Sequence, residues 1–214
     1  MLVDCCQRGS RPNMEFAGNV KTDSTGTSED NPSRLLFALS SKIERLVTRN
    51  EECIELLPTT GTNGLYEGTH APDISISKYL QRIHRYTQCS LSCFVTGFVF
   101  IDQLIHRQPD FPLVRINVHR LLLTSIMVAT KFLDDVHFNN AFYAKVGGIS
   151  VLELNYLEVD FLFRLKFRLH VTSMTYQGYC SHLERELLSM RGDKIEKPLP
   201  CCHVFPDEAT QPEP

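Results

Sequence analysis

The sequence predicts an all-α fold in which five consecutive helices form a bundle, with one flanking helix on each side and disordered termini. Apolar residues recur with helical spacing from about residue 34 to about residue 190. The breaks between these helical segments are short, as they are between neighbouring helices of a bundle. The one alternating stretch, "ISIS" at 74–77, has no second strand-like run to pair with.

The segments before the bundle differ from it in composition. Residues 1–33 are rich in small polar residues and poor in large apolar ones, which predicts a disordered arm. Residues 34–69 are expected to form an amphipathic helix over 34–57, followed by a linker. The linker sequence "PTTGTNGLYEG" (58–68) is dominated by turn-forming residues.

Residues 70–172 carry the five bundle helices, each with a recognisable start or stop signal. Ser75 or Ser77, Ser90 and Asn117 are expected to cap the first three helices, and a Ser-x-x-Glu capping box at Ser150 opens the fifth. The second helix is apolar nearly all round, so it should be buried on every side. Gly97 within it would permit a close approach of another helix. The expected helices cover 76–87, 90–107, 118–133, 139–148 and 150–165.

After the bundle, residues 173–190 are expected to form one further helix. Residues 191–214 contain five prolines after Lys197, and a disordered tail is expected there.

Composition and charge narrow the function classes. No run reaches the ~18 apolar residues of a membrane span, and the N-terminus lacks an apolar core of signal-peptide length. An intracellular protein, in the nucleus, the cytoplasm or both, is therefore expected, without a membrane role. The net charge of −3 and the lack of a basic cluster argue against nucleic-acid binding.

The eight cysteines show no CxxC pair, so the sequence favours free thiols and no metal site or cofactor. Zinc binding by "CSH" (180–182) together with "CCH" (201–203) is the alternative that the spacing leaves open. Sequence motifs typical of enzymes are also missing. A helical metal bundle would carry paired Glu-x-x-His ligands, and no Gly-rich phosphate loop or catalytic triad pattern occurs.

The charges of the fifth helix are unevenly placed on a helical wheel. Glu153, Asp160 and Arg164 share one narrow stripe, which is expected to face solvent. Glu158 falls instead inside the apolar arc, so its carboxylate is either partly buried or faces a partner; in the alternative it lies at the edge of the arc and reaches water. The arc is made of Leu154, Phe161, Leu162 and Leu165.

Lys131 ends the long apolar helix in "MVATKFLDD" (127–135), and three roles are open to it. It could be a surface cation favourable with the helix dipole, or it could pair with Asp134 or Asp135. It could also neutralise Glu158, because a partly buried carboxylate needs a cation. Such a pair would fix the packing of the two helices and leave hydrogen-bonding groups turned outward.

Three separated motifs resemble the cyclin box, and are most similar to the plant U-type (P-type) cyclins, relatives of the yeast phosphate-pathway cyclin. They are "YLQRI" (79–83), "HRLLLTSIMVATKFLDD" (119–135) and "ELNYLEVDFLFRLKFRL" (153–169). The resemblance covers about residues 70–172. It implies a five-helix box and a regulatory subunit, not an enzyme, that binds and activates a cyclin-dependent serine/threonine kinase in cell-cycle or phosphate signalling.

The resemblance also implies a docking site. In the family, a lysine that ends the third box helix pairs with a glutamate of the fifth, and the pair receives backbone groups at the end of the kinase's C-helix. Lys131 and Glu158 match these positions, and apolar neighbours complete the expected kinase-binding surface. These neighbours are Val128, Phe132, Leu162 and Phe167.

Two departures limit what is carried over. No room remains after about residue 172 for a second cyclin fold, and "KYLQRIHRYT" lacks the apolar groove motif with which mitotic cyclins dock substrates. The alternative function is a cyclin-fold transcription adaptor or scaffold without kinase activation.

Overall fold

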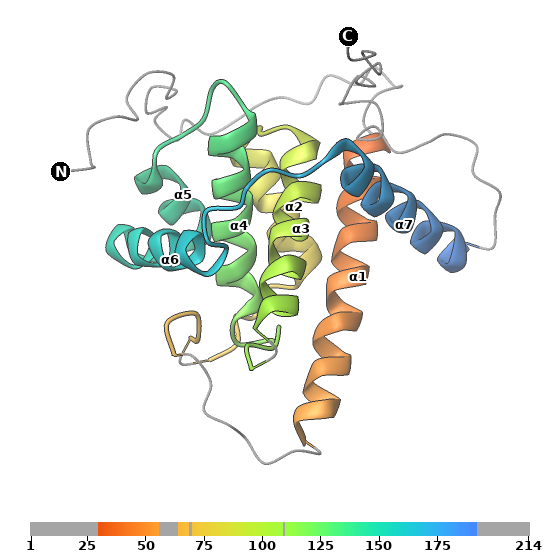
Figure 1. The fold of residues 1–214 in the computed structure, drawn as a ribbon, viewed down its shortest axis with the longest axis horizontal. Helices are drawn as coiled ribbons and strands as arrows, with labels where there is room; N and C mark the ends of the chain where they lie inside the picture. The colour runs from red at the N-terminus through yellow and green to blue at the C-terminus, as the bar shows by residue number, and fades with distance from the viewer. Residues whose placement is uncertain (1–29, 56–63, 69, 109, 192–214) are drawn as a thin grey trace, which may run out of the picture.

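The computed structural model describes residues 30–55, 64–68, 70–108 and 110–191. Seven α-helices and no β-strand lie in these ranges, which confirms the all-α prediction (Figure 1). Most of the two termini and of the linker, where disorder and turns were expected, lie outside the described residues. The helices are α1 (Asp30–Glu55), α2 (Ile76–Thr87), α3 (Leu91–Arg107), α4 (Val118–Leu133), α5 (Asn140–Gly147), α6 (Val151–Arg164) and α7 (Ser173–Arg191).

Helices α3 and α4 form the centre of the molecule and pack closely against each other (Figure 1). A Cβ atom on Gly97 of α3 would lie 3.1 Å from the backbone nitrogen of Ile126 on α4, so only glycine fits this crossing without a shift. This confirms the close approach expected at Gly97. No helix among the described residues combines the length and apolarity needed to cross a bilayer.

Two of the expected N-caps bind the first turn of their helix. The side-chain oxygen of Ser75 accepts a hydrogen bond from the backbone of α2, and Ser150 does the same for α6. Asn139, which was not among the expected caps, caps α5 in the same way, and Gly148 ends that helix with a φ of 74°, a left-handed conformation that favours glycine. The local signals therefore place these helix ends correctly.

Two expected caps act differently. Ser90 precedes α3, but its hydroxyl donates to the carboxylate of Asp134 at 2.7 Å, and its backbone N–H donates to the same carboxylate at 3.0 Å. Asn117 precedes α4, yet its side chain accepts from the Val114 N–H and donates to the Pro112 carbonyl. Asp134 thus joins the end of α4 to the start of α3 and is not the partner of Lys131.

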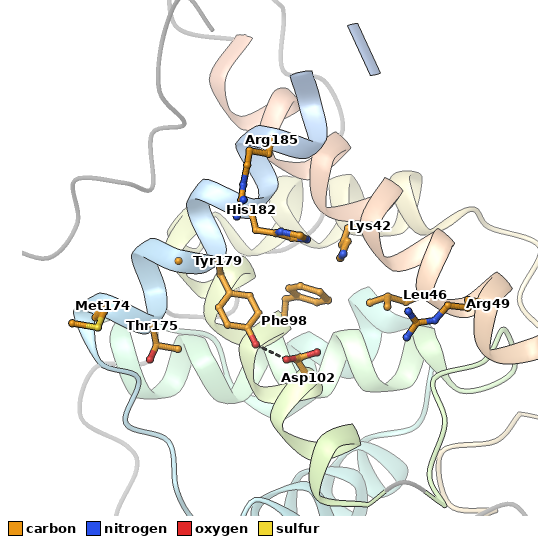
Figure 2. A pocket seen from close by; sticks show the side chains of 11 residues that line it. Lys42, Leu46, Arg49, Phe98, Asp102, Met174, Thr175, Tyr179, His182 and Arg185 are labelled. Carbon is orange, nitrogen blue, oxygen red and sulfur yellow. Dashed lines mark hydrogen bonds between the residues drawn. The ribbon is translucent and has the colours of Figure 1, made fainter. Parts of the chain in front are cut away.

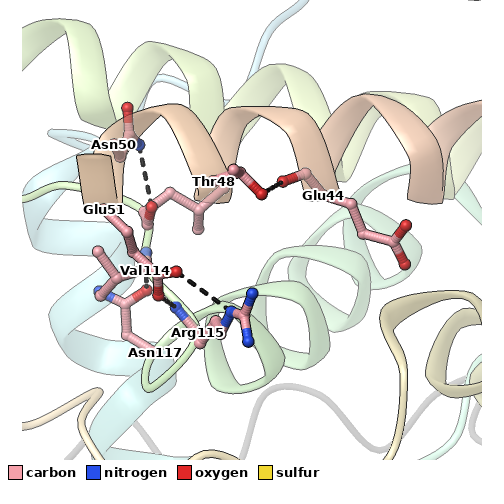
Figure 3. A network of polar contacts seen from close by, with 8 residues as sticks. Glu44, Thr48, Asn50, Glu51, Val114, Arg115 and Asn117 are labelled. Atoms are coloured by element: carbon pink, nitrogen blue, oxygen red, sulfur yellow. Dashed lines mark hydrogen bonds and ion pairs between the residues drawn. The ribbon is translucent and has the colours of Figure 1, made fainter. Parts of the chain in front are cut away.

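Helix α1 is longer than expected and belongs to the core, against which it packs with Leu35, Leu39 and Ile43. Its last turns are tied to the connector that precedes α4, as Figure 3 shows. Asn50 donates to the Leu113 carbonyl at 2.9 Å, and Glu51 accepts from the backbone and the guanidinium of a single arginine, Arg115. The helix is therefore fixed at both ends of its described length.

Tyr66 falls in the expected linker but is fully buried. Its hydroxyl donates to the Leu157 carbonyl of α6 at 3.0 Å, and its ring packs edge-on against Phe111. Burial, with the Asp160 carboxylate nearby, raises the pKa of Tyr66 above its usual range. The end of this connecting segment is consequently anchored to the core.

Candidate functional site

Lys131 and Glu158 meet at one end of the bundle, where α4 ends beside α6. The Lys131 ammonium lies 2.6 Å from a Glu158 carboxylate oxygen, and the side chains are 25% and 17% exposed. Of the three roles open to Lys131, the structure shows the pairing with Glu158. The expectation that Glu158 is partly buried and neutralised by a cation is confirmed.

Asn140, the first residue of α5, joins the pair. Its side-chain oxygen accepts from Lys131 at 2.5 Å, and its amide donates to the second Glu158 oxygen at 2.6 Å and to Asn155 at 2.7 Å. Lys131, Asn140 and Glu158 therefore form a closed polar triad that links α4, α5 and α6. Asn140 was not among the expected site residues, because no signal in its own segment indicates that α5 begins beside Glu158.

The polar triad still has hydrogen-bonding capacity to offer. An ammonium has three donors, and Lys131 uses two of them on Asn140 and Glu158. Each carboxylate oxygen of Glu158 accepts one hydrogen bond and has a second lone pair. Because both side chains are partly exposed, one donor and two acceptor positions remain for a backbone segment that approaches from outside.

The solvent-facing side of α6 is apolar, contrary to expectation. Leu152, Tyr156, Val159 and Phe163 are spaced by four, three and four residues, so they form one stripe, and all are exposed. We call these four residues, with Phe167 just after the helix, the outer apolar face. Exposed apolar surfaces of this kind mark interaction sites in soluble proteins. The charged stripe on the wheel was not the solvated side.

The three charged residues of that stripe lie at the border of the core and make ion pairs. Glu153 binds the guanidinium of Arg120 on α4 at 2.7 Å. Asp160 binds Arg164 at 2.5 Å, and Arg164 also donates to Gln108 at the end of α3. The expectation of a solvated stripe is wrong because Glu153 and Arg164 bind Arg120 of α4 and Gln108 after α3, which local sequence does not reveal, while Asp160 stays paired with Arg164 of its own helix.

The four apolar neighbours of the expected docking surface are not equally accessible. Phe132 and Phe167 are 50% and 59% exposed, and Leu162 is partly buried against the core. Val128, in contrast, is 3% exposed and lies inside the core, so in this structure it supports the surface from below and does not line it.

The backbone around Phe167 is unusual. Lys166 and Phe167 both have positive φ, 53° and 56°, without a glycine at either position. Their N–H groups donate to the carbonyls of Phe163 and Leu162, which closes the end of α6. The left-handed conformation costs a non-glycine residue about 1–2 kcal/mol, and here it brings the Phe167 ring edge-on to that of Phe163.

The cysteines form no metal site in the part of the chain that the structure describes. No group of three or more His, Cys, Asp or Glu side chains suited to a metal lies there. Cys89, Cys93 and Cys180 are buried and Cys53 is exposed, and none of these four cysteines forms a disulfide. The alternative zinc site needs residues 201–203, which lie outside the described residues.

Comparison with known proteins identifies the family of this chain. A family model described as "Cyclin" matches residues 1–169, so the match includes α1 as well as the segment that carries the motifs. The chain is 48% identical to Cyclin-U4-1 of Arabidopsis thaliana, over 74% of this chain and 80% of the relative. It is 48% identical to Cyclin-U1-1 of the same plant, over 72% and 74%. It is also 38% identical to Cyclin-P4-1 of Oryza sativa subsp. japonica, over 86% and 90%. With a family match over most of its length and these U-type and P-type relatives, the chain belongs to the cyclin family, whose members are regulatory subunits and not themselves enzymes.

Proposed function

We propose that this chain binds and activates a cyclin-dependent serine/threonine kinase through the polar triad and the apolar residues around it. The observation that carries the proposal is the preformed Lys131–Glu158 pair, which is partly exposed and bordered by exposed apolar side chains. The expected kinase-binding residues are Lys131, Glu158, Phe132, Leu162 and Phe167, with Val128 as their support.

The chemistry of the triad suits the end of a helix. The last turn of an α-helix presents backbone carbonyls without partners and a partial negative charge. The free donor of Lys131 complements such carbonyls, while Glu158 accepts from the N–H groups of the chain that follows. Phe132 and the outer apolar face would then cover the apolar side of the bound helix.

Activation would follow from selective binding. A kinase is active when its C-helix turns inward and the Lys–Glu ion pair of its active site forms. A surface that fits only the inward helix shifts the kinase toward this conformation by the difference between its affinities for the two states. All catalytic groups would belong to the kinase.

The test is a binding and activity assay on purified proteins. A cyclin-dependent kinase is mixed with the wild-type chain, with Lys131→Ala and with Glu158→Ala, and phosphate transfer to a peptide is measured. Lys78→Ala and Glu44→Ala, which remove exposed charges of the same kinds elsewhere, are the matched controls. Activation by the wild type and both controls, with loss in both triad variants, supports the proposal.

Circular dichroism must show that the triad variants remain folded. Should no member of a kinase panel be bound or activated by the wild-type chain, the docking role is refuted, and an adaptor or scaffold role would replace it. A link to cell division or to phosphate supply is part of the proposal. Protein abundance followed through a synchronised division cycle and after phosphate withdrawal distinguishes the two.

A further inference from the structure

A second surface feature lies away from the polar triad, between α1, α3 and α7. It is a pocket of about 540 Å³, within the size range of ligand-binding sites, and Figure 2 shows the side chains that line it. Figure 1 places α6 and the α1–α7 pair on opposite sides of the central helices. Both sites are therefore open to different partners at the same time.

The floor of the pocket is apolar. Phe98 of α3 and Leu46 of α1 form its base, and Met174 of α7 lies at its rim with 84% of its surface exposed. A flexible methionine so exposed adapts to apolar groups of different shape. The pocket therefore offers a site for a bulky apolar side chain.

The rim of the pocket is cationic. Lys42 and Arg49 come from α1, and His182 and Arg185 come from α7. Among the described residues no carboxylate forms an ion pair with any of the four. Figure 2 shows Lys42 and His182 pointing toward each other above Phe98.

The cations of the rim repel one another, and the Asp102 carboxylate acts in the opposite direction on Lys42 and His182. Burial and the charges of Arg45 and Arg49 lower the pKa of Lys42. Burial, then Lys42 and Arg185, lower the pKa of His182. An anionic group placed between these residues would relieve the repulsion.

Among the described residues that line the pocket, Asp102 is the single acid, and its carboxylate already has partners. Tyr179 donates to its carboxylate, and His106 lies 3.5 Å from the same group. With Lys42, Arg49 and Arg185 charged, His182 neutral and Asp102 ionised, three positive charges face one negative charge. The pocket is thus positive although the chain as a whole carries −3.

We propose that this pocket docks an acidic peptide segment of a partner protein, in which a bulky apolar side chain stands beside carboxylates. The apolar side chain would contact Phe98, Leu46 and Met174, and the carboxylates would meet Lys42, Arg49 and Arg185. A free inorganic anion would leave the apolar floor unused. The site is separate from the triad and does not depend on the proposed kinase role.

The test uses the full chain and a fluorescein-labelled peptide, Gly-Glu-Glu-Phe-Glu-Glu-Gly, followed by fluorescence anisotropy. We expect saturable binding that weakens as NaCl is raised, because surface charges are screened. Replacing the peptide's phenylalanine by alanine should weaken binding at least about tenfold, the effect of removing one buried aromatic side chain. Replacing its glutamates by glutamines should weaken it further.

Variants of the chain locate the site. Arg185→Ala should lower the affinity up to about fivefold, as expected for one exposed ion pair, and Lys42→Glu with Arg185→Glu should abolish binding. Lys78→Glu with Arg82→Glu, which reverses one exposed lysine and one exposed arginine on α2, is the matched control and should bind nearly normally. Absence of binding, or equal losses in the control and the pocket variants, overturns the proposal.

Two other occupants are separated by the same assay. If replacing Phe205 and Asp207 in the full chain strengthens peptide binding, the chain's own C-terminal segment fills the pocket, and a partner is refuted. If sedimentation shows a dimer that Arg185→Glu dissociates, a second copy of the chain is the occupant and the proposal is likewise refuted.

Discussion

The polar triad predicts a specific pattern of stabilities when its charges are removed singly and together. Lys131→Ala, Glu158→Ala and the double variant form a thermodynamic cycle that isolates the interaction between the two side chains. Their partial exposure places the pair between exposed ion pairs, which are worth about 0.2–1 kcal/mol, and buried ones, where loss of one partner costs about 3–5 kcal/mol.

Asn140 limits the loss in each single variant. Without Lys131, the Glu158 carboxylate still accepts from the Asn140 amide; without Glu158, the Lys131 ammonium still donates to the Asn140 oxygen. We therefore expect each single substitution to lower the free energy of unfolding by about 1–2 kcal/mol, which is less than the cost of leaving a fully buried charge without a partner. The double variant should lose about 1 kcal/mol less than the sum, because it leaves no unpaired charge.

Urea denaturation followed by circular dichroism measures these values, provided that the slope m stays constant across the four proteins. A domain of ordinary stability has about 5–15 kcal/mol available, so all four should remain folded in the kinase assay. Strictly additive losses would refute the coupling. Kinase binding that survives in both single variants would show that the triad is structural only.

Three further predictions concern stability and use the same denaturation assay. Gly97→Ala should lower the free energy of unfolding by about 1–3 kcal/mol, because the added methyl group meets the backbone of α4. Gly178→Ala, which has open space around it, should raise the free energy of unfolding by up to about 1 kcal/mol. A rise in both variants would refute the close contact at Gly97. Lys166→Gly should raise the free energy of unfolding by about 0.5–1 kcal/mol, because glycine adopts the left-handed conformation without strain. A fall would show that the lysine side chain stabilises the fold by more than the strain costs. Burial lowers the pKa of His84 and His119 in the folded state, so the stability that their neutral forms contribute is complete above the ordinary pKa near 6.5 and is lost as the pH falls below it. Replacing both by glutamine should flatten the decline between pH 7.5 and 5.5, and an unchanged slope would contradict this.

The helices were predictable from the sequence because their signals are local. The residues that open α2, α5 and α6 bind the first turn of their own helix, and Gly148 ends α5 within its own segment. The Lys131–Glu158 contact was also predictable, because a carboxylate inside an apolar arc needs a partner. Asn140 escaped notice because nothing in its own segment indicates that α5 begins beside that carboxylate.

The face of α6 that contacts solvent could not be predicted in the same way. The helix has two apolar arcs, a buried one with Leu154, Leu157 and Phe161, and the exposed outer apolar face. Periodicity reveals that such arcs exist but does not say which one packs on the core. The charges between the arcs were no guide, because Arg120 on α4 draws Glu153 to the border of the core.

Under the proposed function, the polar triad and the outer apolar face would contribute to partner binding in different ways. Burial of exposed apolar side chains would supply the larger share of the affinity, since each Phe- or Leu-sized group is worth about 1.5–3 kcal/mol when fully covered. The triad is already assembled by its hydrogen bonds in the free chain, so a partner does not have to order it. Its remaining donor and acceptors can hydrogen-bond to a backbone segment in one position only, whereas an apolar surface allows a bound helix to shift along it. Truncating the Phe163 side chain should therefore weaken binding of every partner of this face, while Glu158→Ala should chiefly remove the ability to choose the correctly placed helix.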